Sequence, residues 1–230
     1  MINLYSGTPG SGKSLDVAKT IIDHLQSKKP VIANFDIKVE AVKGKKKGTF
    51  LFVDNYDLTP DFLINYSRNI FSQKSKMRED YILLVIDECQ LLFNARDWNI
   101  KGRNDWLSFF TQHRKYGFKI ILVAQFDRMI DRQIRSLIEY EYVHRKVSNY
   151  GIGGAILSTV LGGGMFVSVQ VWYPLREKVG AKWFKCTKSL YSLYDTYNMF
   201  TVSDGVGVGG LHESGTGEFL SDSLLDNTNT

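Results

Sequence analysis

Short apolar runs alternate with segments of helical periodicity along most of the chain. The runs predict strands over Ile2–Ser6, Pro30–Asn34, Thr49–Val53, Tyr81–Ile86, Lys119–Ala124 and Glu139–Arg145. Apolar residues at helical spacing predict helices that end near Gln26 or cover Asn104–Tyr116 and Ile130–Leu137. The run at 81–86 is apolar throughout, as expected of a central parallel strand that is covered on both faces. Strands and helices in this alternation indicate an α/β fold with a mostly parallel, doubly wound sheet.

The pattern changes after the last of these strands. Polar and apolar residues alternate over Glu139–Arg145, and we expect a β-hairpin region to be added to the sheet after Glu139. No charged residue occurs between Lys146 and Arg176, and Gly151–Val171 within this stretch has the length of a membrane span. Its six glycines and the alternation of its second half weaken a single helical span. Three alternatives stay open: a strand with an apolar loop or short helix at a membrane interface, a full span, or a buried hairpin.

Two other segments differ in composition from the predicted core. Lys43–Gly48 is a lysine-rich turn before a predicted strand, so we expect a β-hairpin with a basic tip. The tip is either a solvated turn or a contact for phosphates of DNA or of lipid headgroups. From Val202 onward small and polar residues dominate, which predicts a disordered tail. We therefore expect one α/β domain over residues 1–200, with residues 147–175 as an apolar hairpin or membrane-interacting insert, and a tail over residues 201–230.

Composition is that of an ordinary globular protein. The chain has 230 residues, of which 43% are hydrophobic and 23% charged, enough for one α/β domain with a real core. Its formal charge of +5 is compatible with nucleic acid or an anionic membrane surface and demonstrates neither. Cys89 and Cys186 lack metal-type spacing, so we expect reduced thiols and a cytosolic location. Because the first strand begins at Ile2, we expect no N-terminal targeting signal.

Eight residues between the first strand and the first helix match the phosphate-loop pattern G-x-x-x-x-G-K-[ST] at every fixed position. This phosphate loop consists of Gly7, Thr8, Pro9, Gly10, Ser11, Gly12, Lys13 and Ser14. Its glycines let successive backbone N–H groups point into one concavity, and the following helix N-terminus adds partial positive charge. Lys13 supplies a charge for the β- and γ-phosphates, and the Ser14 hydroxyl supplies an oxygen ligand for Mg²⁺. The motif therefore predicts a P-loop NTPase that binds ATP with Mg²⁺.

Asp87 and Glu88 directly follow the apolar strand predicted over Tyr81–Ile86. A buried strand that ends in Asp is the second nucleotide-binding motif, in which Asp87 helps to hold Mg²⁺ or its water ligands. Glu88 can accept a proton from the attacking water and is the candidate general base. A helix cap followed by a first-turn acid would be the purely structural explanation of the pair. We favour the catalytic interpretation because the phosphate loop lies upstream.

Two further polar residues are candidates for the hydrolytic site. Gln125 ends the strand predicted over Lys119–Ala124 and can hydrogen-bond both the γ-phosphate and the lytic water. Because the carboxyl ends of parallel strands share one edge of a sheet, we expect Gln125 close to the phosphate loop and Asp87. Arg114 lies in the last turn of the predicted helix Asn104–Tyr116, where the helix dipole favours a cation. Arg114 is alternatively an arginine finger that acts on a neighbouring subunit. Rivals for that role are Arg128, Arg132 and Arg135, and the histidines lack metal-ligand spacing.

These stretches together resemble the zonula occludens toxin (Zot) family, whose relatives include the filamentous-phage assembly ATPases within the FtsK/HerA-like group. The resemblance is carried by Gly7–Ser14, Val31–Phe35, Leu84–Gln90, Gln112–Gln125 and the stretch from Trp172 to Tyr197, which looks like Gram-positive members. It covers roughly residues 1–200, and its most particular part is Gln112–Gln125. Many family members carry a membrane helix after the ATPase domain, whereas a polar tail follows here.

The resemblance implies a Mg²⁺-dependent ATPase that drives assembly or extrusion of a filamentous phage or related mobile element. It implies a homo-oligomeric ring with shared nucleotide sites at the cytoplasmic face of the host membrane. The implied partners are phage or mobile-element assembly proteins, single-stranded DNA as cargo, and a membrane surface through Ile152–Val171. Two alternatives are a nucleotide-gated scaffold with negligible turnover and a soluble DNA-dependent ATPase that uses the lysine-rich turn.

Overall fold

The computed structural model describes residues 1–39, 42, 44, 47–72, 77–96, 102–149 and 164–185. Its strands are β1 (Ile2–Ser6), β2 (Val31–Ala33), β3 (Phe50–Phe52), β4 (Ile82–Ile86), β5 (Phe118–Val123), β6 (Tyr140–Lys146), β7 (Met165–Trp172) and β8 (Glu177–Lys185). Its helices are α1 (Lys13–Gln26), α2 (Pro60–Ser72), α3 (Arg103–Gln112) and α4 (Arg132–Arg135). Short 3₁₀ turns are η2 (Cys89–Leu91) after β4, η3 (Asp127–Met129) after β5 and η4 (Val147–Asn149) after β6.

All eight strands form one mixed sheet in the order β3-β2-β4-β5-β1-β6-β7-β8. The strands from β3 to β6 in this order pair in parallel, so each connection between sequence neighbours is a crossover. β7 and β8 extend the sheet as an antiparallel hairpin next to β6. The mostly parallel core and the hairpin added after Glu139 are therefore confirmed.

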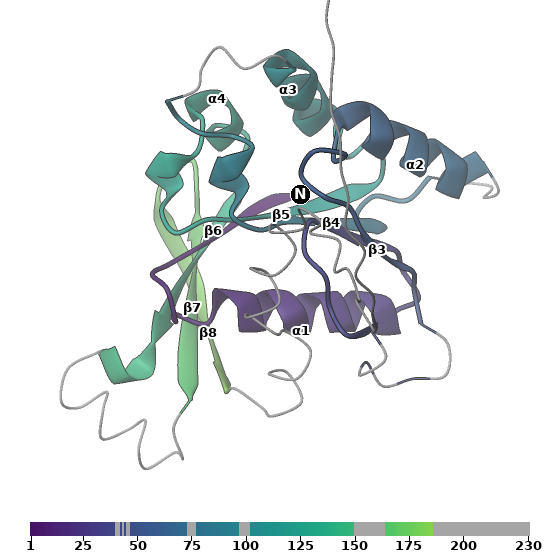
Figure 1. Cartoon of the computed structure of the whole chain (residues 1–230). Coiled ribbons are helices and arrows are strands. Elements are labelled where there is room, and N and C mark those ends of the chain that lie inside the picture. Colours follow the sequence, from purple (N-terminus) through teal and green to yellow (C-terminus); the bar gives the residue numbers. More distant parts are fainter. Residues whose placement is uncertain are drawn as a thin grey trace, which may run out of the picture.

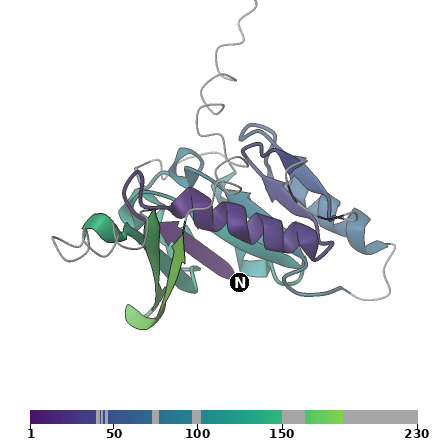
Figure 2. The ribbon, with the colours of Figure 1, turned by 90° about the horizontal axis from the view of Figure 1, so that it is seen from below.

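Helices cover both faces of the parallel core. Figure 1 shows α1 beneath the sheet and α2, α3 and α4 above it. Figure 2, seen from below, shows α1 lying along the sheet. Side chains of β1 alternate between the two faces of the sheet. Leu4 packs in a hydrophobic cluster with residues of α2 and α3, and Tyr5 packs in a second cluster with residues of α1. Two covered faces are why β4 is apolar at every position.

Two local predictions are wrong. β2 and β3 pair in parallel, with Ile32 opposite Leu51, so the segment between them is a crossover and not the turn of a β-hairpin. Of its lysine-rich turn, residues 43, 45 and 46 lie outside the described residues. The predicted helix Asn104–Tyr116 ends at Gln112, and the chain turns over the next five residues into β5. Helix α2 was not predicted at all; it buries Leu63 and Phe71.

The apolar stretch Gly151–Val171 does not form one helical span, because its second half is strand β7. β7 pairs with β6 along seven residues, and Val167 and Ser168 are buried. In the described part of the chain, none of the helices has the length and apolar character needed to cross a membrane. Residues 151–163, Cys186 and the tail over 201–230 lie outside the described residues. Cys89 is a buried free thiol.

Candidate functional site

The phosphate loop connects β1 to α1, and its glycines are required by its conformation. Gly7, Gly10 and Gly12 have φ of 143°, 72° and 94°, which L side chains rarely adopt. Gly12 also lies against β7, where a Cβ atom would come within 2.6 Å of the Phe166 ring. The loop is closed by a hydrogen bond of 3.1 Å from the Ser11 N–H to the Thr8 carbonyl. Its shape is therefore set by the backbone and by the hairpin that packs on it.

Lys13 begins α1 and folds back over the loop. Its Nζ donates to the Gly7 carbonyl at 2.6 Å and to the Thr8 carbonyl at 3.3 Å. Burial lowers the pKa of the Lys13 ammonium, and the charges of Asp87 and Glu88 act in the opposite direction. The cation therefore lies within electrostatic reach of the acidic pair, as the sequence predicts.

Asp87 and Glu88 follow β4 and are held by Asn34, which follows the neighbouring strand β2. The Asp87 N–H donates to Asn34 Oδ1 at 2.7 Å, and Asn34 Nδ2 donates to the Asp87 carbonyl at 2.9 Å. Glu88 adopts a left-handed conformation with φ of 45°, and its N–H donates to Asp87 Oδ1 at 2.9 Å. Gln90 Nε2 donates to Glu88 Oε2. The side-chain amide of Asn34 therefore holds the Asp87 backbone, and the carboxylates of Asp87 and Glu88 accept hydrogen bonds from the Glu88 N–H and from Gln90.

Asn34 is not among the predicted site residues, although it lies within Val31–Phe35, one of the stretches that carry the family resemblance. The sequence shows only that Asn34, like Asp87, is a polar residue that directly follows an apolar strand; the fold makes the two strands neighbours. Ala33 and Val85 are register partners, so the residues that follow them are brought together.

Gln125 lies where the sequence places it, just after β5 and beside the phosphate loop. Its backbone carbonyl accepts a hydrogen bond of 3.1 Å from the Gly7 N–H. Gln125, Gly7 and Thr8 contribute to the lining of one pocket of about 380 Å³. The ends of β1, β4 and β5 thus bring the phosphate loop, the acidic pair and Gln125 to one edge of the sheet.

Arg114 lies elsewhere. It belongs to the turn between α3 and β5, at the opposite edge of the sheet from the phosphate loop. Its Nη2 pairs with Glu139 Oε1 at 2.9 Å, and its side chain is 54% exposed. Of its rivals, Arg128 is exposed in η3, beyond Gln125, and Arg135 donates to the Asp127 carbonyl at 3.4 Å. Arg114 can therefore reach a phosphate loop only on another subunit.

Two polar contacts of the buried Asp16 carboxylate, which the sequence did not reveal, support the first turn of α1. His144 Nε2 on β6 lies 3.0 Å from Asp16 Oδ2, and both side chains are almost fully buried. Lys182 Nζ on β8 lies 3.5 Å from Asp16 Oδ1. Burial by itself would raise the pKa of the Asp16 carboxyl, but the hydrogen bonds and charges of His144 and Lys182 hold that pKa below its ordinary value. These contacts tie the start of α1 to the strands beyond β1.

The donor set at the strand ends fits a magnesium ion that is bound together with phosphates. Ser14 and Asp87 offer hard oxygen atoms, the ligands that Mg²⁺ prefers. Among the described residues no group of three or more His, Cys, Asp or Glu side chains could hold a metal ion. Mg²⁺ is usually held by one or two protein oxygens together with water and substrate phosphates, so Ser14 and Asp87 would be a sufficient set of protein ligands.

Comparisons with known proteins give one family. The family model described as zonular occludens toxin (Zot) matches residues 1–199. The Gene 1 protein of Enterobacteria phage fd is 27% identical over 220 residues, which are 90% of this chain and 62% of that protein. The Gene 1 protein of Salmonella phage IKe is 33% identical over 129 residues, which are 52% of this chain and 35% of that protein. The chain thus spans less than two thirds of the length of these relatives.

Solved structures share the fold. The N-terminal domain of zonular occludens toxin from Neisseria meningitidis superposes with a TM-score of 0.53 and 19% identity, covering 84% of this chain and 98% of that domain. The DNA-packaging ATPase from Sulfolobus turreted icosahedral virus superposes with a TM-score of 0.50 and 16% identity, covering 81% of this chain and 97% of that chain. These likenesses confirm the predicted P-loop NTPase fold.

Proposed function

The chain belongs to the zonular occludens toxin family, and from this premise we propose that it is an ATP-hydrolysing motor for the assembly or extrusion of a filamentous phage or related mobile element. The observation that carries the proposal is the convergence of the phosphate loop, Asp87-Glu88 and Gln125 at one sheet edge. The Gene 1 proteins of filamentous phages support the biological setting. Its partners would be phage or mobile-element assembly proteins, with single-stranded DNA as cargo.

Each residue of this edge has a role in hydrolysis. The loop amides receive the phosphates of ATP, and Lys13 exchanges its contacts with the loop carbonyls for contacts with phosphate oxygens. Ser14 and Asp87 would hold Mg²⁺, which neutralises the charge that develops on the phosphates. Glu88 accepts a proton from the attacking water, and Gln125 orients that water against the γ-phosphate. Asn34 keeps Asp87 and its neighbour in place.

The proposal is tested by the release of phosphate from ATP by the purified chain in the presence of Mg²⁺. Release that exceeds that of a Lys13→Ala variant, and that stops when EDTA removes Mg²⁺, would support it. A chain that binds ATP without such release would instead be the nucleotide-gated scaffold.

Arg114 is the arginine finger of the proposal, and it would act on a neighbouring subunit in a ring. We expect Arg114→Ala to lose at least about 100-fold in hydrolysis while it keeps ATP binding, because a finger contacts the transition state only. Mixing Arg114→Ala with Lys13→Ala subunits should partly restore phosphate release, since each supplies what the other lacks. Loss of the half-exposed pair with Glu139 should cost little stability.

The matched control is Arg78→Ala, another exposed arginine whose removal changes the net charge equally. It should hydrolyse ATP like the wild type. Full activity of Arg114→Ala, or no recovery on mixing when both variants assemble normally, would exclude a finger that acts in trans.

We further propose that the motor works at the cytoplasmic face of the host membrane. The support is the charge-free stretch between Lys146 and Arg176, of which residues 150–163 are not described. We expect the chain to float with anionic liposomes and a variant without residues 152–161 to stay in the dense fraction. A deletion of equal length, residues 203–212, is the control and should float. Equal flotation of both variants would show that Ile152–Leu161 is not the attachment.

A further inference from the structure

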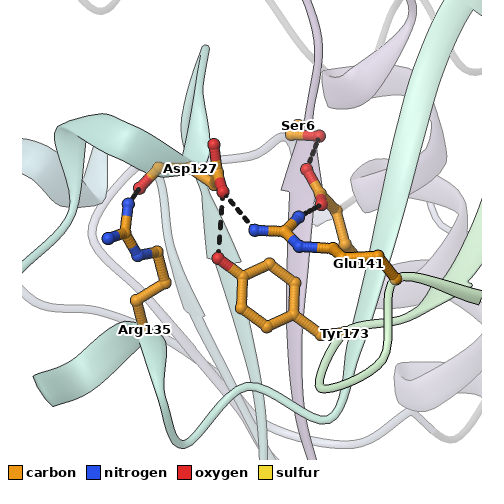
Figure 3. Close-up of polar contacts among 6 residues, drawn as sticks. Ser6, Asp127, Arg135, Glu141 and Tyr173 are labelled. Carbon is orange, nitrogen blue, oxygen red and sulfur yellow. Dashed lines mark hydrogen bonds and ion pairs between the residues drawn. The ribbon is translucent and has the colours of Figure 1, made fainter. Parts of the chain in front are cut away.

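The turn of the β7–β8 hairpin places one arginine between two carboxylates beside the phosphate loop. Arg176 Nη1 donates to Glu141 Oε2 at 2.7 Å, and its Nη2 donates to Asp127 Oδ2 at 2.6 Å. Glu141 lies on β6, whereas Asp127 opens η3, two residues after Gln125. Figure 3 shows the carboxylates of Asp127 and Glu141 on the two sides of this contact. One side chain of the hairpin therefore bridges two segments that belong to the parallel core.

These contacts close a ring around the first residue of the phosphate loop. Glu141 Oε1 accepts a hydrogen bond of 2.6 Å from Ser6 Oγ, and Ser6 directly precedes Gly7. The Gly7 N–H in turn donates to the Gln125 carbonyl at 3.1 Å. From Gln125 the backbone leads to Asp127, and Arg176 completes the circuit back to Glu141. The ring thus links the phosphate loop and Gln125 to the hairpin.

The arginine is held firmly at this position. Its guanidinium lies 3.9 Å from the centre of the Tyr173 ring, and the Tyr173 hydroxyl donates to Asp127 Oδ2 at 3.0 Å (Figure 3). The Glu141 side chain is only 9% exposed, and its two oxygens accept hydrogen bonds from Ser6 and from Arg176. Arg176 itself has a φ of 57°, a left-handed conformation that costs a non-glycine residue some strain, and its side chain is 52% exposed.

Asp127 is kept ionised by the same contacts. Burial alone would raise the pKa of its carboxyl, but hydrogen bonds from Arg176 and Tyr173 hold that pKa below its ordinary value. The ion pair is therefore intact at neutral pH.

We propose that Arg176 is a positioning residue, through which the β7–β8 hairpin fixes the distance between the phosphate loop and Gln125 and so sets the rate of hydrolysis. The inference rests on the proposed function, because it assigns Gln125 to the lytic water. The Arg176 guanidinium contacts the carboxylates of Asp127 and Glu141 and the ring of Tyr173, and these are not residues of the phosphate loop. It acts on the reaction only through the residues that it holds.

This arrangement predicts a specific kinetic effect. The loop amides and Lys13 bind the phosphates, and they remain when Arg176 is changed, so the affinity for ATP should be nearly unaffected. The placement of Gln125 against the lytic water matters in the transition state only, so the loss should appear in kcat. A displacement on the order of 1 Å at a reacting centre reduces rates by about 100-fold.

The first test compares Arg176→Gln with Lys178→Gln. Both changes remove one positive charge from an exposed position of the same hairpin and keep a long polar side chain. Only Arg176→Gln removes the contacts with Asp127 and Glu141. We expect Arg176→Gln to lose about 10- to 100-fold in kcat with a KM for ATP within about threefold of the wild type. Lys178→Gln should match the wild type. Equal kcat values for both variants, with equal thermal midpoints, would overturn the inference.

Two companion variants separate geometry from charge. Arg176→Lys keeps the charge but lacks the planar fork that serves two carboxylates, so we expect most of the loss in kcat to persist. Asp127→Asn breaks the same contact from the other side, and in the double variant with Arg176→Gln the losses should not add. Full rescue by lysine, or additive losses, would show that the hairpin acts through its net charge and not by positioning.

A measurement without turnover keeps the inference apart from the proposed function. In Arg176→Gln the amide proton of Gly7 should exchange with solvent about fivefold faster than in the wild type or Lys178→Gln, because its acceptor Gln125 is no longer held. If the wild type hydrolyses ATP no faster than Lys13→Ala, the proposed function fails and this exchange rate alone decides the role of Arg176. Unchanged exchange at Gly7 would contradict that role.

Discussion

Replacing Lys13 with alanine is expected to abolish ATP hydrolysis and to weaken ATP binding. The Lys13 ammonium already lies within the loop, 2.6 Å from the Gly7 carbonyl, so a small movement brings it to the β- and γ-phosphates. Its positive charge is partly desolvated there, which strengthens its attraction to phosphate oxygens. Alanine removes the charge that opposes repulsion between the phosphates and Asp87-Glu88. We expect kcat to fall by at least about 100-fold.

Phosphate release and binding of a fluorescent ATP analogue measure the two effects separately. The control is Lys19→Ala, which removes a lysine from the same helix α1 outside the phosphate loop. Lys19→Ala should bind and hydrolyse ATP like the wild type. Hydrolysis by Lys13→Ala at the wild-type rate would contradict a hydrolytic site at residues 7–14.

Replacing Glu88 with glutamine is expected to leave the protein bound to ATP that it cannot turn over. Glutamine has the same shape and can still accept the hydrogen bond from Gln90, so the folded site should persist. An amide cannot accept a proton from the attacking water, and loss of a general base costs about 100- to 10,000-fold in rate. Binding of ATP should stay close to that of the wild type, because the phosphate loop and Lys13 are unchanged.

A single-turnover experiment with labelled ATP distinguishes this outcome from a binding defect. In Glu88→Gln the label should remain as ATP on the protein long after the wild type has released phosphate. Glu79→Gln, a change at an exposed glutamate away from the phosphate loop, is the control and should turn over normally. Rapid hydrolysis by Glu88→Gln would show that another group accepts the proton.

Predictions from contiguous sequence were the accurate ones. The phosphate loop, helix α1 and strand β4 are each encoded by neighbouring residues, so their periodicity and motif were sufficient. Helix α2 is hard to predict because Ser67, a polar residue, lies between Leu63 and Phe71 on its buried face and interrupts the apolar pattern. The error over β2 and β3 concerned the pairing direction, which local sequence does not determine when the connection is long.

The supporting contacts could not be predicted, because they join residues far apart in sequence. Asn34 and Asp87 are separated by 53 positions, Asp16 and His144 by 128, and Asp127 and Arg176 by 49. Each of these residues is also an ordinary polar residue in its own segment. Their partners depend on the strand order, and with one sequence no signal ties the two members of a pair together.

By itself, the sequence determined that this chain has a phosphate loop, an acidic pair after a buried strand and an α/β fold, because each depends on residue types at short, fixed spacing. Tertiary structure decided where the arginines lie. The order of β5, β1 and β6 places Arg114 at the edge away from the phosphate loop and lets the hairpin carry Arg176 to Asp127 and Glu141. The physical reason is that parallel strands gather their carboxyl ends at one edge, whatever the distance between them in the chain.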